Sequence, residues 1–177
     1  MTFSLKNIEE TMTLGAMLAE AMRRGGVRSL YLSAPLGGGK TTLVRGFAAA
    51  LPGGSLAEVA SPSFTLCNEY PTSPRILHAD LYRLPDHSAL PEEIEDSLDE
   101  GEAIIVLEWP ERLRESSKAV ERIDLQLIPA KDSACKYLDN ENKTCETLRT
   151  ATLSACGTAA EKVLEGLRTA IAERFTN

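Results

Sequence analysis

The segment APLGGGKTT, at residues 34–42, combines residue types that bind nucleotide phosphates. Consecutive glycines allow backbone N–H groups to turn toward an anion, and a helix that begins directly after them adds the positive end of its dipole. Lys40 can reach the β- and γ-phosphates, and the hydroxyl of Thr41 can coordinate Mg²⁺. The segment therefore predicts a P-loop that binds a nucleoside triphosphate. The residues expected to bind it are Gly37, Gly38, Gly39, Lys40, Thr41 and Thr42.

Ala34 occupies the position of the first glycine in the P-loop pattern G-x-x-x-x-G-K-[ST]. Alanine fits there only if the backbone keeps a negative φ, because a positive φ favours glycine. The alternative interpretation is a glycine-rich turn in which Lys40 is merely solvated. A strand-like run before the loop, Leu30–Ser33, and a helix-like segment after it favour the P-loop.

Two carboxylates follow apolar runs and are candidates for the metal and the chemistry. A P-loop needs a carboxylate that holds the metal through bound water, usually at the end of a neighbouring buried strand. Glu108 ends the run AIIVLE and is the predicted metal-side carboxylate, although a solvent-facing glutamate is the alternative. Asp80, which follows Ile76 and Leu77, could orient the attacking water or the metal, and the sequence leaves this open. With Lys40, these carboxylates are the predicted catalytic residues.

The apolar spacing along the chain predicts the elements that position these residues. Helical spacing extends from Asn7 to Gly25–Gly26, and a continuous apolar run at Ala103–Leu107 is typical of a strand buried on both faces. We expect one α/β domain over residues 1–177, with the fold of a P-loop NTPase: a mainly parallel central sheet, flanking helices and some antiparallel strands. Further strands are expected in residues 61–70, 75–84, 123–128, 134–138 and 148–153, and helices in 91–101 and 158–175.

The charge is acidic and unevenly distributed. The chain has 19 Lys and Arg against 26 Asp and Glu, a net charge of −7, which argues against strong direct binding of nucleic acid. Residues 80–111 hold 11 acidic residues and one basic residue, Arg83. The acidic run Glu92–Glu102 predicts either a solvated amphipathic helix or a face for a basic partner surface.

The remaining composition favours a cytoplasmic protein. The four cysteines form no C-x-x-C pair, so we expect reduced thiols rather than a zinc site. The N-terminal residues have neither the basic nor the apolar region of a secretory signal, and no apolar run reaches membrane-spanning length, so no membrane association is expected.

Four sequence blocks, in this order, resemble the bacterial tRNA threonylcarbamoyladenosine biosynthesis ATPase family, TsaE (YjeE). The first is LYLSAPLGGGKTTLVRGF, which contains the P-loop. The others are SPSFTL at residues 61–66, HADLYRL at residues 78–84 and LEWPERL at residues 107–113. The resemblance covers about residues 5–130.

This resemblance implies a slow, Mg²⁺-dependent ATPase that binds ATP and works with the partner proteins TsaD and TsaB, which install threonylcarbamoyl on tRNA next to the anticodon. The chain itself would not transfer the carbamoyl group. The resemblance assigns ATP to residues 37–42, Mg²⁺ to Thr41 and Glu108, and hydrolysis or switching to Asp80. It also places Thr11 near the adenine.

Departures from the family pattern and two alternatives stay open. Ala34 replaces a glycine, Ser63 replaces the usual threonine of S-P-T, and the stretch Lys131–Glu146 is longer and more polar than expected. One alternative is a small-molecule kinase on the same fold, which would need an acceptor pocket and an arginine-rich lid, whereas residues 85–101 are acidic. The other is an interaction module in which nucleotide binding sets the conformation and turnover is incidental.

Overall fold

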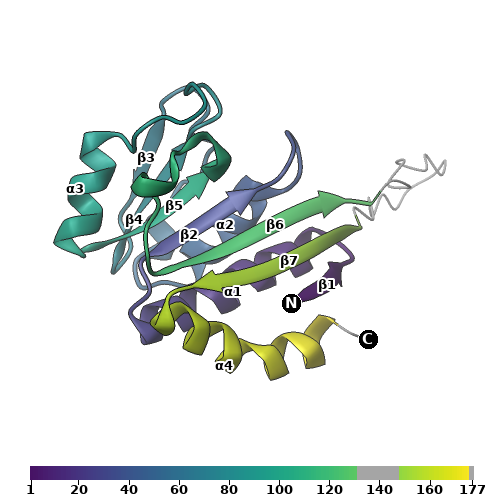
Figure 1. Ribbon diagram of the computed structural model, residues 1–177. Helices are drawn as coiled ribbons and strands as arrows, with labels where there is room; N and C mark the ends of the chain where they lie inside the picture. The colour runs from purple at the N-terminus through teal and green to yellow at the C-terminus, as the bar shows by residue number, and fades with distance from the viewer. Residues whose placement is uncertain (131–147, 176–177) are drawn as a thin grey trace.

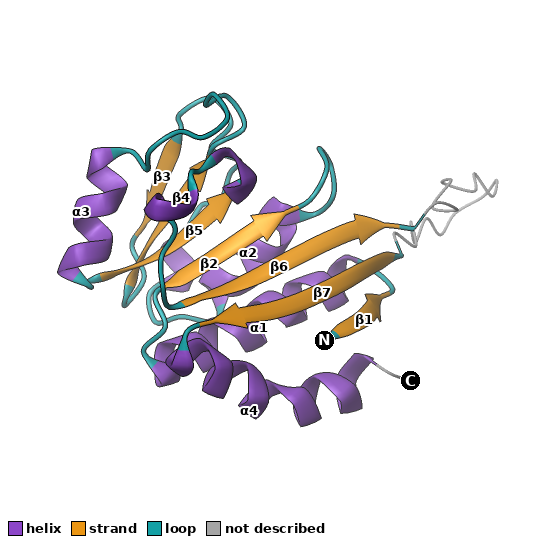
Figure 2. Cartoon of the chain, in the orientation of Figure 1, coloured by secondary structure: helices purple, strands orange, loops and turns teal. Residues whose placement is uncertain are grey.

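A twisted seven-stranded sheet with helices on both faces forms the centre of the molecule (Figures 1 and 2). The computed structural model describes residues 1–130 and 148–175. The strands are β1 (Thr2–Leu5), β2 (Ser29–Ser33), β3 (Cys67–Tyr70), β4 (Arg75–Asp80), β5 (Ala103–Glu108), β6 (Arg122–Pro129) and β7 (Arg149–Cys156). The helices are α1 (Ile8–Gly25), α2 (Lys40–Ala49), α3 (Glu92–Glu100) and α4 (Thr158–Phe175), with short 3₁₀ turns at Gly54–Leu56, Pro110–Arg112 and Glu115–Ser117.

The strand order is β1-β7-β6-β2-β5-β4-β3. The central neighbours β6, β2, β5 and β4 pair in parallel, whereas β3 pairs with β4, and β7 with β6 and β1, in antiparallel directions. The expected fold, a mainly parallel sheet with antiparallel additions, is therefore confirmed. In a parallel sheet, loops that follow neighbouring strands meet at one edge, which is where such folds bind ligands.

Alternation along the central strands divides the core between the two faces of the sheet. Ile104 and Val106 of β5 pack on the face that α1, α2 and α4 cover, whereas Ile105 and Leu107 pack on the face that α3 covers. Continuing the alternation by one residue places Glu108 on the face of α2. The same count along β4 places His78 and Asp80 on that face.

Helices α1 and α2 contact each other closely because glycines lie between them. A Cβ atom on Gly46 would lie 2.0 Å from the carbonyl oxygen of Met12, and one on Gly15 would lie 2.2 Å from that of Leu43. The side chain of Asn7 caps α1 by accepting the N–H of Glu10 at 2.8 Å. The first helix is thus fixed at its start and against α2, which begins at the P-loop.

The observed elements differ from the expected ones in residues 61–66 and at the N-terminus. The expected strand over residues 61–70 is wrong in its first part, because only Cys67–Tyr70 pairs as a strand and the preceding residues form turns. Phe64, whose apolar side chain favoured a strand, is 89% exposed. The first strand, β1, was not expected, and the strand proposed at residues 134–138 lies outside the described residues. None of the described helices is long and apolar enough to cross a membrane.

Candidate nucleotide-binding site

The P-loop connects the end of β2 to the first turn of α2, as the sequence predicts. Gly37 and Gly39 have φ values of 74° and 102°, which favour glycine. Ala34 is not among the described residues with positive φ, so alanine fits at this position. A Cβ atom on Gly38 would lie 2.9 Å from the Cβ atom of Ala34, so the loop has no room for a side chain there.

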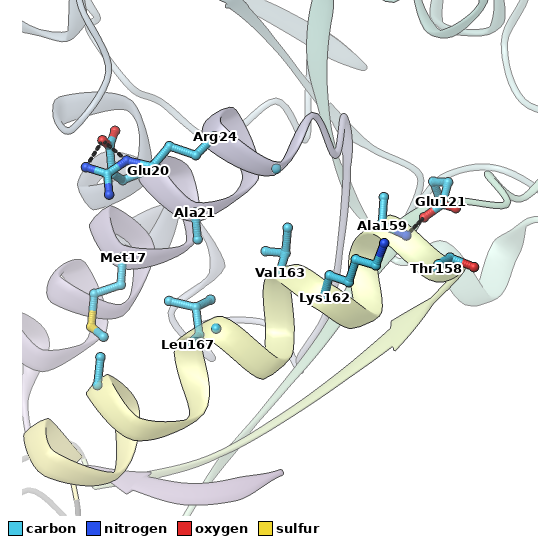
Figure 3. A pocket seen from close by; sticks show the side chains of 13 residues that line it. Met17, Glu20, Ala21, Arg24, Glu121, Thr158, Ala159, Lys162, Val163 and Leu167 are labelled. Atoms are coloured by element: carbon cyan, nitrogen blue, oxygen red, sulfur yellow. Dashed lines mark hydrogen bonds and ion pairs between the residues drawn. The ribbon is translucent and has the colours of Figure 1, made fainter.

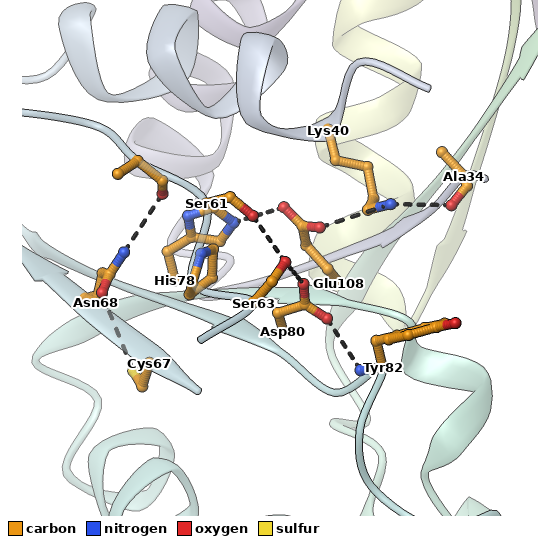
Figure 4. A network of polar contacts seen from close by, with 12 residues as sticks. Ala34, Lys40, Ser61, Ser63, Cys67, Asn68, His78, Asp80, Tyr82 and Glu108 are labelled. Carbon is orange, nitrogen blue, oxygen red and sulfur yellow. Dashed lines mark hydrogen bonds and ion pairs between the residues drawn. The ribbon is translucent and has the colours of Figure 1, made fainter. Parts of the chain in front are cut away.

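Lys40 is the first residue of α2, and its ammonium group is buried (Figure 4). Its Nζ atom donates to the carbonyl of Ala34 at 2.9 Å and lies 3.6 Å from Oε2 of Glu108. It also lies 4.5 Å from the centre of the Trp109 ring, a cation–π distance. The lysine therefore bridges the P-loop and the end of β5.

Trp109 has a backbone conformation that is uncommon for a bulky residue, with a φ of 61°. The backbone N–H of Trp109 donates to the carbonyl of Leu32 at 3.1 Å, which ties the end of β5 to β2 directly before the P-loop. Its ring packs against Tyr82 at a centroid distance of 5.0 Å. The strained residue thus holds an aromatic ring beneath Lys40, next to the carboxylate of Glu108.

Glu108 is 2% exposed and is held by a buried chain of hydrogen bonds (Figure 4). Its Oε1 atom lies 2.9 Å from Nε2 of His78, and Nδ1 of His78 lies 3.3 Å from the hydroxyl of Tyr70. That hydroxyl donates to the carbonyl of Ala60 at 2.9 Å. Because the tyrosine gives its one proton to Ala60, Nδ1–H of His78 donates to the tyrosine oxygen.

Asp80 lies beside Glu108 in the parallel pairing of β4 and β5 but has different partners. Its Oδ2 atom accepts the hydroxyl of Ser63 at 2.5 Å, and its Oδ1 atom accepts the N–H of Tyr82 at 2.9 Å. The Ser63 oxygen in turn lies 2.8 Å from that of Ser61. Since Ser63 donates to Asp80, Ser61 is the donor in the second contact. The loop that contains both serines is therefore bonded to Asp80.

A cavity of about 190 Å³ lies among these groups. It is bounded by the P-loop, the first turn of α2, the loop of Ser61 and Ser63 (called the serine loop) and one carboxylate. The lining residues are Leu36, Gly37, Gly38, Gly39, Lys40, Thr41, Thr42, Ser61, Ser63 and Glu108. The structure thus brings all the predicted phosphate-binding residues and Glu108 together. Asp80 does not line the cavity and reaches it only through Ser63.

The donor set of this cavity fits a nucleoside triphosphate with Mg²⁺. The hydroxyl of Thr41 and the carboxylate of Glu108 are oxygen ligands of the kind that Mg²⁺ prefers, and Lys40 supplies a buried cation for phosphate oxygens. Among the described residues, no three His, Cys, Asp or Glu side chains cluster to hold a metal by themselves. Phosphate and water oxygens would therefore have to complete the coordination of the ion.

Thr11 is fully buried on α1 and does not line the cavity. Its hydroxyl donates to the carbonyl of Asn7 at 3.0 Å, and Nη1 of Arg149 lies 3.5 Å from it. Nε of the same arginine donates to the carbonyl of Gly38 in the P-loop at 3.1 Å. The sequence reasoning missed Arg149, which follows a polar stretch and belongs to no motif. Its role as a neighbour of the P-loop follows only from the position of β7.

A larger hollow of about 890 Å³ lies between α1 and α4, away from the P-loop (Figure 3). Met17, Ala21, Val163 and Leu167 give it a mainly apolar lining, and the Glu20–Arg24 ion pair lies at its rim. Its lining contains none of the P-loop residues and neither Glu108 nor Asp80. The cavity at the P-loop is therefore the candidate site.

Comparisons with known proteins identify the family of the chain. A family model described as threonylcarbamoyl adenosine biosynthesis protein TsaE matches residues 5–137. The tRNA threonylcarbamoyladenosine biosynthesis protein TsaE of Mycobacterium tuberculosis is 40% identical over 124 residues, which cover 64% of this chain and 71% of that protein. The protein of the same description from Aquifex aeolicus is 38% identical over 109 residues, which cover 61% and 75%. The crystal structure of Bacillus subtilis YdiB superimposes with a TM-score of 0.67 and 25% identity, covering 96% and 95% of the two chains.

Proposed function

The chain belongs to the TsaE family, and from this premise and the site geometry we propose that it is a slow ATPase that binds ATP with Mg²⁺ in support of tRNA threonylcarbamoyladenosine biosynthesis. One observation carries the proposal. Lys40 and Glu108, which are 68 positions apart in the sequence, meet at 3.6 Å beside a cavity lined by the P-loop glycines. A buried cation, a carboxylate and a glycine loop around one cavity are the parts that bind a metal–triphosphate complex.

Each side chain has a distinct proposed role. Gly37, Gly38 and Gly39 surround the phosphates, and Lys40 exchanges its contact with Glu108 for phosphate oxygens when ATP binds. Thr41 and Glu108 hold Mg²⁺, directly or through water. The ion supplies charge neutralisation at the phosphates, and the protein residues orient it.

Asp80 has a different proposed role because it is bonded to the serine loop. It holds Ser63 at the edge of the cavity, where that loop can respond to a bound phosphate. We assign it to hydrolysis or switching rather than to the first contact with the metal. Thr11, which is buried next to Arg149, is proposed to lie near the adenine.

The proposed partners are TsaD and TsaB. The acidic residues expected to face a basic partner are all exposed on α3, namely Glu92, Glu93, Glu95 and Asp96. Their exposure permits docking, and reversing their charges tests it: unchanged binding to purified partners would leave the face as solvated surface only. A chain with this acidic balance would leave tRNA binding to those partners.

The test of the nucleotide site is calorimetric titration of the purified protein with ATP and Mg²⁺. Lys40→Ala should lose measurable binding, because it removes the buried cation of the site. Lys162→Ala, which removes an exposed lysine of α4, is the matched control and should bind as the unaltered protein does. Unchanged affinity in Lys40→Ala would refute the assignment of the site.

Turnover is tested separately by following labelled ATP. Free phosphate as the sole labelled product supports an ATPase, whereas transfer to an added acceptor would support a kinase. Asp80→Asn should retain binding but lower hydrolysis, because it weakens the bond that holds Ser63 at the edge of the cavity. Asp86→Asn, an exposed aspartate on a loop, is its control. If Asp80→Asn and Glu108→Gln abolish hydrolysis but the partner complex works fully, binding alone suffices.

A further inference from the structure

Arg149, the first residue of β7, buries a guanidinium group against the P-loop from outside the matched motifs. The residue is 6% exposed. Its Nε atom donates to the carbonyl oxygen of Gly38 at 3.1 Å, across a separation of 111 residues in the sequence. Hydrogen bonds from a charged donor are about twice as strong as neutral ones, so this contact is a firm restraint on the loop.

The contact fixes the orientation of one peptide group in the P-loop. A trans peptide is planar, with its C=O and N–H bonds pointing in opposite directions. When the carbonyl of Gly38 points toward Arg149, the N–H of Gly39 must point away from it. Gly39 also provides the space, because a Cβ atom on it would lie 2.8 Å from Nε of Arg149. Glycine at this position therefore leaves room for the guanidinium and also permits the φ of 102°.

The position of the arginine is itself fixed on several sides. In the sheet, Arg149 is paired with Pro129 of β6 and with Leu5 of β1. Its Nη1 atom lies 3.5 Å from the hydroxyl of Thr11, whose proton is given to a backbone carbonyl, so the hydroxyl oxygen is the acceptor. The guanidinium thus joins the sheet and α1 to the P-loop.

We propose that Arg149 is a positioning residue of the nucleotide site, which holds the Gly38–Gly39 peptide in the orientation that receives a polyphosphate. The proposal rests on the proposed binding of ATP with Mg²⁺, and it adds a residue from the antiparallel part of the sheet to that site. The contribution of the bond to Gly38 is preorganisation of the loop. The ligand class is a nucleoside di- or triphosphate, whose phosphates occupy the loop.

The test compares Arg149→Met and Arg149→Lys by calorimetric titration with ATP and Mg²⁺. Loss of a hydrogen bond from a charged donor raises the dissociation constant by about ten- to a hundredfold. Arg149→Lys should show most of this loss, because an ammonium group lacks the fork that reaches both Gly38 and Thr11. The number of sites per chain should not change, whereas a purely structural role would lower that number and leave the dissociation constant unaltered.

A second measurement needs no nucleotide. Hydrogen exchange of the peptide that spans residues 36–42 should be faster in both Arg149 variants, because the loop loses its restraint. Arg122→Met is the matched control: Arg122 is half-buried on β6, donates to the carbonyl of Ala119 at 2.7 Å and lies at the opposite end of the β6–β7 ladder. It should alter neither the exchange of the loop nor the affinity.

The outcomes are separable. A folded Arg149→Met variant with unchanged affinity and loop exchange overturns the inference, and so does full recovery in Arg149→Lys, which would reduce the role to charge. If Arg149→Met lacks a cooperative unfolding transition, Arg149→Lys carries the test. Failure of the unaltered protein to bind ATP with Mg²⁺ would instead overturn the proposed function. The exchange measurement needs no nucleotide, so it would still test the restraint of the loop by Arg149.

Discussion

Replacing Lys40 with methionine and Glu108 with glutamine, singly and together, should reveal a strong coupling between them in the nucleotide-free protein. The charged atoms are 3.6 Å apart, and the side chains are only 6% and 3% exposed. At an effective dielectric constant of about 20, two unit charges at this distance attract by about 4.6 kcal/mol. His78 shares the carboxylate and offsets part of this attraction, so we expect a coupling of about 2–4 kcal/mol.

The assay is urea-induced unfolding of the four proteins without nucleotide. Each single variant should lose stability, because it leaves the other charge buried without its partner. The double variant should lose less than the sum of the single losses, and that difference is the coupling. Added salt should change the coupling little, since buried charges are poorly screened.

The pair Arg168–Glu165 on α4 is the control for distance. Its atoms are closer, at 2.6 Å, but the side chains are 56% and 73% exposed. Solvent should keep that coupling below about 1 kcal/mol, so the longer but buried pair is the stronger one. A Lys40–Glu108 coupling as small as the control value would refute the reasoning, because the ammonium group would then not depend on the carboxylate.

Two further predictions concern packing and thiol chemistry. Gly46→Ala should lower the free energy of unfolding by about 2–3 kcal/mol, because the added Cβ atom meets the carbonyl of Met12 at 2.0 Å. Gly166→Ala on α4 has open space around the added Cβ atom and should raise the free energy of unfolding by about 0.5–1 kcal/mol. Equal melting temperatures for the two variants would contradict this prediction. Burial raises the pKa of the Cys67 thiol to about 11, so at pH 8 its thiolate is about a hundredfold rarer than at the ordinary pKa. Alkylation of Cys67, followed by mass spectrometry, should be slow in the folded protein and fast in urea. The rate in the folded protein should rise about tenfold per pH unit up to about pH 11. Equal rates at pH 8 in the folded protein and in urea would contradict the raised pKa.

The sequence was informative where function depends on the ends of buried elements. The apolar run that ends at Glu108 predicts a central strand, and a parallel sheet brings the end of such a strand beside the P-loop. Asp80 ends the neighbouring strand β4 and is paired with Glu108 of β5. Periodicity and strand ends are local properties, so they could be predicted without knowing the tertiary structure.

The sequence was uninformative where a role depends on which strands lie side by side. His78 is a single histidine on a strand, and its contact with Glu108 requires the observed alignment of β4 and β5. Arg149 contacts the P-loop only because β7 follows β6 in the sheet order. Phe64 misled the strand prediction because an apolar side chain normally marks the core, yet here it lies exposed on the loop that binds Asp80 through Ser63.

Two neighbouring buried carboxylates would repel each other if both faced the same space without compensating donors. The structure avoids this by giving Glu108 an ion pair with Lys40 and a hydrogen bond with His78, and Asp80 a hydroxyl and a backbone N–H. The two sets of donors differ in what a ligand can displace. Lys40 can exchange Glu108 for a phosphate and so free the carboxylate for a metal, whereas Asp80 keeps both of its bonds unless the loop of Ser63 moves. The different partners of the two carboxylates therefore support the proposed division of roles, with Glu108 at the metal and Asp80 on the loop.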